Sequence, residues 1–325
     1  MTEILPWQRG PWQGVQKRRA AGRLPHALLC SGVAGLGKLR FANTLAQSLL
    51  CSTPDGAGGP CGTCCGCRLF LAGTHPDFKR AEPDEPGKPI KVDSIRELCE
   101  FLAYTSQYNG YKIAVVAPAD QMNANAANSL LKTLEEPSPN SLLLLVTAYP
   151  SRLLATVRSR CQTIAFHAPP RSEAVSWLVS QRAGQGNPEL LLSLSDGAPL
   201  KALAYAEGGR LANRLTLLDN YQQLLNGHLD PILAAESWAK GDVAEQIQWL
   251  IGWHMDMIRL KIIVDPPRLL NPDLRSKLQT IAARHSVRTL YRRLDAAMRL
   301  SALSNTPINT QWMLETFLAG CASGS

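Results

Sequence analysis

Four closely spaced cysteines are the residues of this sequence best suited to bind a metal. Cys51, Cys61, Cys64 and Cys67 are separated by nine, two and two residues. Cysteine thiolates are preferred zinc ligands, and short repeated spacings of this kind are typical of structural zinc sites. The segment between Cys51 and Cys61 has almost no apolar side chains, so it cannot build a core of its own, and a bound ion could hold it in place. The spacing predicts a closed, structural Zn²⁺ site on these four thiolates.

Two alternatives to this zinc site are open from the sequence. Cys65 lies within the cluster and could replace Cys64 or Cys67, although the repeated two-residue spacing favours the set named above. The thiols could also be reduced bystanders or form a labile disulfide. In a reducing compartment, such a cluster suggests metal rather than disulfides.

A glycine-rich segment is the second pattern that indicates chemistry. Residues 32–39 (GVAGLGKL) fit the phosphate-binding pattern G-x-x-x-x-G-K, but Leu39 stands where a Ser or Thr normally ligates Mg²⁺. In such loops the glycines let backbone amides surround phosphate oxygens, and the lysine reaches the terminal phosphates. The residues in question are Gly32, Gly35, Gly37 and Lys38. We expect a degenerate loop that binds nucleotide weakly or not at all, and the alternative is a chance glycine-rich turn.

The composition is that of a globular protein that does not enter membranes. The chain has 325 residues, of which 45% are hydrophobic and 18% charged, which excludes a disordered chain. The longest strongly apolar run, 142–146, is too short to span a bilayer, and no signal-peptide pattern is visible at the N-terminus. We expect a cytoplasmic protein. Its net charge of +8 permits contact with nucleic acid without requiring it.

The elements that must position these residues alternate in the first half of the chain. Short apolar runs at 27–30, 112–117 and 142–147 predict buried strands, and helical patterns lie between them at 39–50, 94–104 and 124–134. This order predicts an α/β domain with a parallel sheet. Strand signals stop after residue 167, and helical patterns follow. We predict three domains: α/β at 1–168, a small helical domain at 169–208 and a helical domain at 209–325.

Three segments make the first domain resemble a known family. They are residues 73–77 (GTHPD), 128–137 (NSLLKTLEEP) and 158–161 (RSRC). The sequence is similar to the AAA+ clamp loaders of DNA polymerase III over the whole first domain, and more weakly to its end. The resemblance implies an AAA+ (RecA-like) parallel-sheet domain, a small helical lid domain and a C-terminal all-helical collar domain. Members of the family carry a similar four-cysteine module, which supports the zinc prediction.

The family pattern also indicates that this chain does not hydrolyse ATP. Active members have an apolar strand ending in Asp-Glu, whereas here that strand runs into Ala117 and Pro118. Their lid begins Gly-x-x-Arg, and the arginine position holds Leu200. Asp120 lies just beyond the strand end, and we do not expect it to substitute. Because phosphoryl transfer depends on metal binding and on a positioned water, the resemblance implies an inactive nucleotide site.

Arg160 is the catalytic candidate that the resemblance leaves in place. In the family, the arginine of the Ser-Arg-Cys motif projects into the ATP site of the next subunit. A guanidinium can bind phosphate oxygens in a forked geometry and stabilise the charge that develops there. The resemblance therefore implies that Arg160 acts in trans on a neighbour's ATP. The alternative is a solvated surface arginine.

The partners implied by the resemblance are the other members of a heteropentamer. They are the gamma or tau ATPase subunits and the delta subunit, together with the sliding clamp and primer–template DNA. One rival interpretation is an active, gamma-type AAA+ ATPase, and another is a zinc-dependent DNA-binding module. The sequence also predicts a basic stripe along one helix, which could meet DNA or be a solvated face. Its members are Arg284, Arg288, Arg292 and Arg299.

Overall fold

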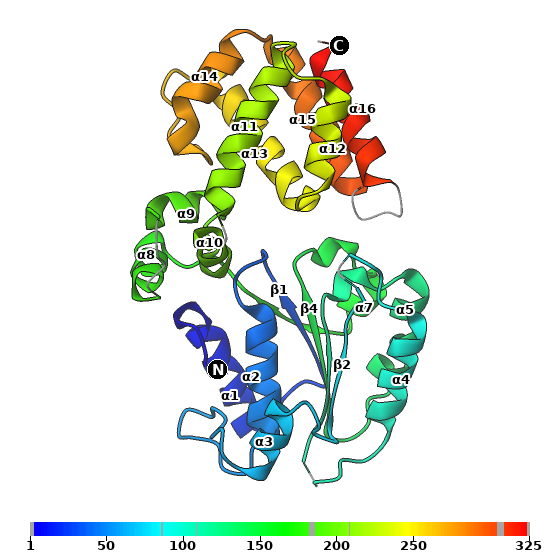
Figure 1. Ribbon diagram of the computed structural model, residues 1–325. Coiled ribbons are helices and arrows are strands. Elements are labelled where there is room, and N and C mark those ends of the chain that lie inside the picture. Colours follow the sequence, from blue (N-terminus) through cyan, green and yellow to red (C-terminus); the bar gives the residue numbers. More distant parts are fainter. Residues whose placement is uncertain are drawn as a thin grey trace. The chain divides into compact units, whose positions relative to one another are not determined.

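The chain forms two compact units, Met1–Pro169 and Pro170–Ser325 (Figure 1). The computed structural model describes residues 3–85, 87–108, 110–181, 186–207, 209–303 and 309–323. Within these ranges, no helix has both the length and the apolar character needed to cross a membrane. The division of the second unit into lid and collar domains stays a prediction, and Gly208, at their predicted boundary, lies outside the described residues.

A five-stranded parallel sheet forms the centre of the first unit, in the order β2-β3-β4-β1-β5. The strands are β1 (Ala27–Ser31), β2 (Phe78–Ala81), β3 (Lys112–Val116), β4 (Ser141–Thr147) and β5 (Gln162–Ala165). The three middle strands, β3, β4 and β1, are buried along their whole length. Continuous burial explains why these strands are apolar throughout rather than alternating, because parallel sheets are covered on both faces.

Helices cover both faces of this sheet (Figure 1). Alternate strand residues, such as Leu29 and Leu145, share one hydrophobic cluster with Ile95 and Leu98 of α4 (Val92–Ala103). The intervening residues point to the other face, where α2 (Lys38–Leu50) lies. The predicted α/β fold class is confirmed.

The remaining elements of the first unit are short and connect this framework. They are η1 (Pro6–Gln8), α1 (Arg9–Ala20), α3 (Cys65–Leu71), η2 (Ala119–Gln121), α5 (Ala124–Ser129), α6 (Leu131–Glu135), η3 (Pro150–Arg152) and α7 (Ala155–Arg158). The helix predicted at 124–134 is divided in two at Leu130, which closes α5 and opens α6. Asn123 begins α5, where its side chain accepts a hydrogen bond from the Ala126 amide.

The second unit is helical throughout its described residues. Its elements are α8 (Arg171–Ser180), α9 (Pro188–Leu194), α10 (Pro199–Ala206), α11 (Arg210–Leu225), α12 (Pro231–Ala239), α13 (Val243–Ile262), η4 (Pro272–Leu274), α14 (Arg275–Ala283), α15 (Val287–Leu303) and α16 (Thr310–Ala322). One hydrophobic cluster connects them, with Trp238 and Trp253 among its fully buried side chains. The helical region predicted after the sheet is therefore confirmed.

The predicted basic stripe is wrong at one of its four positions. Arg284 caps the end of α14, and its guanidinium donates to Asn226 Oδ1 at 2.9 Å. Helix α15 begins three residues later, at Val287, so only Arg288, Arg292 and Arg299 share its exposed side. The chain turns at Arg284 between two helices, which periodicity alone did not reveal.

Candidate functional site

The glycine-rich loop joins β1 to α2, as a phosphate-binding loop does. Gly32 lies so close to the residue after β5 that a Cβ atom there would be 2.3 Å from the Phe166 carbonyl oxygen. Gly37 adopts the left-handed conformation (φ 78°) directly before α2 begins. Both positions need glycine, the first for space and the second for its backbone angle. The structure thus brings Gly32, Gly35, Gly37 and Lys38 together in one strand–loop–helix turn.

The lysine of this loop bonds to the loop itself. Lys38 Nζ donates to the Val33 carbonyl oxygen at 2.7 Å, and the residue is only 7% exposed. Its burial lowers the pKa of Lys38, while the nearby charges of Cys30 and Asp120 act in the opposite direction. An ammonium group carries three N–H donors, and this bond occupies one of them.

Residues before α1 hold the far side of the same loop. Trp7 Nε1 and Gln8 Nε2 both donate to the Leu36 carbonyl oxygen, at 3.0 and 2.9 Å. Gln8 Nε2 also lies 2.9 Å from the Gly37 carbonyl oxygen, and Gln8 is fully buried. Sequence reasoning missed these contacts, because they join residues about 30 positions apart. They hold the Leu36 and Gly37 carbonyl oxygens of the loop against the residues before α1.

The carboxylates that a nucleotide-hydrolysing site needs do not follow β3. This strand ends at Val116, and the next residues are Ala117 and Pro118. Asp120 lies in η2, and its Oδ1 accepts a short hydrogen bond, 2.5 Å long, from the Thr147 hydroxyl group at the end of β4. One oxygen of the Asp120 carboxylate is therefore bound to the end of β4.

Arg160 lies on the surface of the first unit, between α7 and β5, as the sequence predicted. Its side chain is 36% exposed. One terminal nitrogen, Nη2, is 2.6 Å from Glu135 Oε1, and Nη1 donates to the Thr156 carbonyl oxygen at 3.0 Å. Sequence reasoning did not identify Glu135 as a partner. The guanidinium is thus held at the surface with donors still available for a further acceptor.

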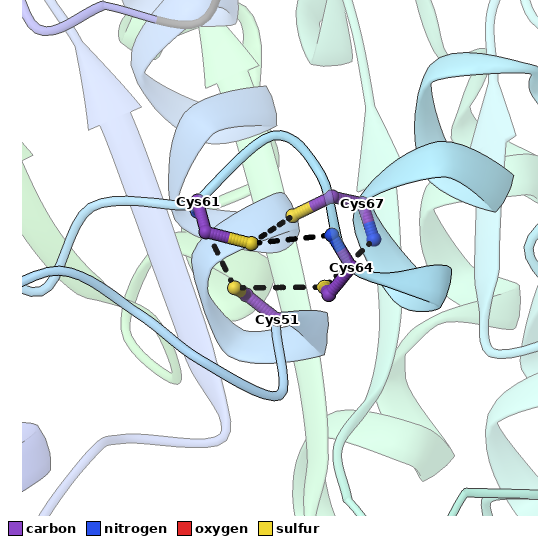
Figure 2. A group of neighbouring side chains, drawn as sticks. All are labelled: Cys51, Cys61, Cys64 and Cys67. Atoms are coloured by element: carbon purple, nitrogen blue, oxygen red, sulfur yellow. Dashed lines mark hydrogen bonds between the residues drawn. The ribbon is translucent and has the colours of Figure 1, made fainter.

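The four predicted zinc ligands meet in one cluster, drawn in Figure 2. Their sulfur atoms all lie within 4.8 Å of one another. The sulfur atoms of Cys61 and Cys67 are 3.9 Å apart, and those of Cys64 and Cys51 are 3.8 Å apart. A tetrahedron with Zn–S bonds of about 2.3 Å places its sulfurs about 3.8 Å apart. The donor set and its spacing therefore fit a zinc ion.

Hydrogen bonds from backbone and side-chain groups around this cluster favour the thiolate at two of the positions. Hydrogen bonds, led by that from Thr53, lower the pKa of Cys61 to about 5. At Cys64 burial raises the pKa, but hydrogen bonds from Cys67 and Ser52 outweigh it and leave the pKa at about 7. Burial raises the pKa of Cys67 to about 12. A bound cation would offset that last effect, since a metal ion deprotonates a coordinating thiol.

The local fold explains how residues 16 positions apart meet in this cluster. Cys51 follows the last turn of α2, and Cys64 caps the first turn of α3, where its sulfur accepts a hydrogen bond from the Cys67 amide. Cys67 is fully buried on α3. Cys65 is exposed and is not a member of the cluster. The set favoured by the spacing is the one that the structure assembles.

Known proteins resemble this chain along nearly its full length. A family described as "DNA polymerase III, delta subunit" matches residues 7–170, and one described as "DNA polymerase III, delta subunit, C terminal" matches residues 208–321. The DNA polymerase III subunit delta' of Pseudomonas aeruginosa is 36% identical over 329 residues, which cover 99% of this chain and 98% of that protein. The chain belongs to the delta-prime subunits of DNA polymerase III, a clamp-loader family. The predicted resemblance is confirmed.

A second curated protein and a solved structure are also similar to this chain. The delta' subunit of Escherichia coli is 36% identical over 257 residues, covering 78% of this chain and 76% of its own. A solved structure of a gamma subunit-related protein from Thermotoga maritima aligns with 96% of this chain and 99% of its own, at 18% identity and a TM-score of 0.47.

Proposed function

We propose that this delta-prime family member is an ATPase-inactive structural subunit of a heteropentameric clamp loader. Its partners would be gamma or tau ATPase subunits and the delta subunit, and the assembly would load the sliding clamp onto primed DNA during cytoplasmic replication. The C-terminal helices would form the oligomerising collar. Family membership supports these assignments, because the match extends through both units of the chain.

The surface position of Arg160 is the observation that carries this proposal. The arginine belongs to the Ser-Arg-Cys segment and keeps free donors at the surface of the α/β unit. In the assembled complex, it would bind phosphate oxygens of ATP held by the adjoining subunit. Arginines supplied in trans accelerate GTP hydrolysis by about 10³–10⁵-fold, so one side chain can account for a large effect.

The phosphate loop of the chain itself supports an inactive role. Leu39 cannot ligate Mg²⁺, because its side chain carries no oxygen. Neither Ala117 nor Pro118 can orient a water. We propose that nucleotide binds here weakly or not at all.

The cysteine cluster supports a structural zinc ion in the same unit. Cys51, Cys61, Cys64 and Cys67 would hold it, and all four positions would then be filled by protein ligands, which leaves none for substrate. The ion would fix the polar segment between Cys51 and Cys61 against α2 and α3. Its role would be folding rather than catalysis.

The proposal is tested with the assembled complex. Arg160→Ala in this chain is expected to reduce DNA-stimulated ATP hydrolysis while leaving assembly intact, as judged by gel filtration. Arg158→Ala is the matched control, because Arg158 is also exposed and lies in the same segment. Unchanged hydrolysis with Arg160→Ala would contradict the trans role. ATP hydrolysis by the isolated chain would instead favour the rival, gamma-type interpretation.

A further inference from the structure

Glu135 is the residue that orients the Arg160 side chain. It ends α6, and its Oε1 lies 2.6 Å from Arg160 Nη2. The second contact of the guanidinium, from Nη1 to the Thr156 carbonyl oxygen, is 3.0 Å long. One acceptor belongs to α6 and the other to α7, so the two helices hold the guanidinium from two directions.

We infer that Glu135 is a positioning residue for Arg160, whose guanidinium it holds in place at the surface, ready for a neighbour's phosphate. This inference rests on the proposed trans role of Arg160. An arginine side chain has several rotatable bonds, and confining it to one arrangement beforehand reduces what must be ordered when the subunits meet. Glu135 supplies that confinement within this chain.

The contacts leave the guanidinium able to act. Of the five N–H donors of an arginine, Glu135 and Thr156 each take one, which leaves about three for phosphate oxygens. The carboxylate keeps its charge partner when the remaining donors bind another acceptor. Glu135 can therefore stay bound during catalysis rather than having to release Arg160.

The exposure of the pair separates positioning from folding. The two side chains are 36% and 51% exposed, and ion pairs this open to water contribute little to net stability. Removing the Glu135 carboxylate should therefore leave the melting temperature almost unchanged. Its effect should appear in the rate of the reaction that Arg160 serves.

The experiment measures single-turnover ATP hydrolysis on primed DNA. The complex is assembled from gamma or tau subunits, the delta subunit and a variant of this chain. Glu135→Ala is expected to slow the site adjoining this chain by about tenfold, since small misplacements of a catalytic group are costly. The ATP concentration for half-maximal rate should stay within about twofold. Glu135→Gln keeps an accepting oxygen and should restore part of the rate. Glu136→Ala, an exposed carboxylate one position away, is the matched control and should match the wild type.

A double variant distinguishes this inference from the function on which it rests. In the Arg160→Ala background, adding Glu135→Ala should cause no further loss, because Glu135 acts through Arg160. If Arg160→Ala leaves the rate of ATP hydrolysis unchanged, the trans role is refuted, and the positioning role with it. An effect of Arg160→Ala with normal rates for Glu135→Ala would refute only the positioning role. If adding Glu135→Ala to Arg160→Ala slows ATP hydrolysis further, the positioning role is also refuted, because Glu135 would then act without Arg160.

Discussion

A buried histidine makes the stability of the helical unit depend on pH. His254 lies on α13 with no exposed surface. Its Nδ1 is 2.7 Å from the Leu250 carbonyl oxygen, and its Nε2 is 3.0 Å from the Tyr221 hydroxyl group. Burial lowers its pKa to about 4, with a further contribution from the nearby charges of Arg293 and His285. The folded protein therefore keeps this ring neutral where an unfolded chain would protonate it.

The expected size of this effect follows from the two pKa values. An unfolded histidine titrates near 6.5, so below that pH the unfolded chain binds a proton that the folded chain does not. The contribution of neutral His254 to the free energy of unfolding is therefore fully present above about pH 6.5. It is lost as the pH falls toward 4. Linkage gives a loss of about 2 kcal/mol at about pH 5, relative to pH 7.5.

Urea unfolding at these two pH values tests the prediction, with tryptophan fluorescence as the signal. Trp249 and Trp253 lie on α13 beside His254, so this helix contributes to the signal. Other groups also titrate in this range, and the comparison with His254→Gln removes their contribution. The stability advantage of the wild type over His254→Gln should shrink by about 2 kcal/mol on acidification. An advantage that is the same at both pH values would refute the reasoning.

Three further outcomes are expected of the α/β unit. Cys67→Ser should remove bound zinc, measured by mass spectrometry of the native protein, and lower the melting temperature, whereas Cys65→Ser should do neither; a metal-free wild type would contradict this. Asp77→Ala should cost about 3–5 kcal/mol in urea unfolding, because it leaves buried Lys112, 3.4 Å away, without its charge partner. Asp120→Asn should leave nucleotide binding and hydrolysis by the isolated chain at background, measured by calorimetry and phosphate release; an activity that this substitution abolishes would contradict the inactive role.

The parts of the fold that could be predicted from the sequence are those with a strong local pattern. The buried strands β1, β3 and β4 are continuous apolar runs, and the spacing of Cys61, Cys64 and Cys67 is enough to suggest one site. Strand β2 was missed, because it is a short edge strand of sequence FKRA in which only Ala81 is buried. Helix α1 was missed for a related reason, since Trp12 and Val15 are its only buried side chains.

The contacts that position the candidate site could not be predicted in the same way. Glu135 and Arg160 are 25 positions apart and meet only because α6 and α7 lie together in the folded unit. The Thr147 hydroxyl group, at the end of β4, donates a hydrogen bond to Asp120, which lies beyond the end of β3. Such pairs depend on the tertiary arrangement, for which a single sequence carries no periodic signal. Arg160 could be chosen as a candidate from its motif, whereas its contact with Glu135 could be found only in the structure.

The most direct test of the trans role counts ATP molecules in the first turnover of the assembled complex. Rapid-quench measurements with primed DNA and clamp would compare the burst amplitude of the wild type with those of Arg160→Ala and Arg158→Ala. Because the ATP site adjoining this chain would lose its trans arginine, Arg160→Ala should lower the burst amplitude, and Arg158→Ala should leave it unchanged. A full burst with Arg160→Ala would contradict the account.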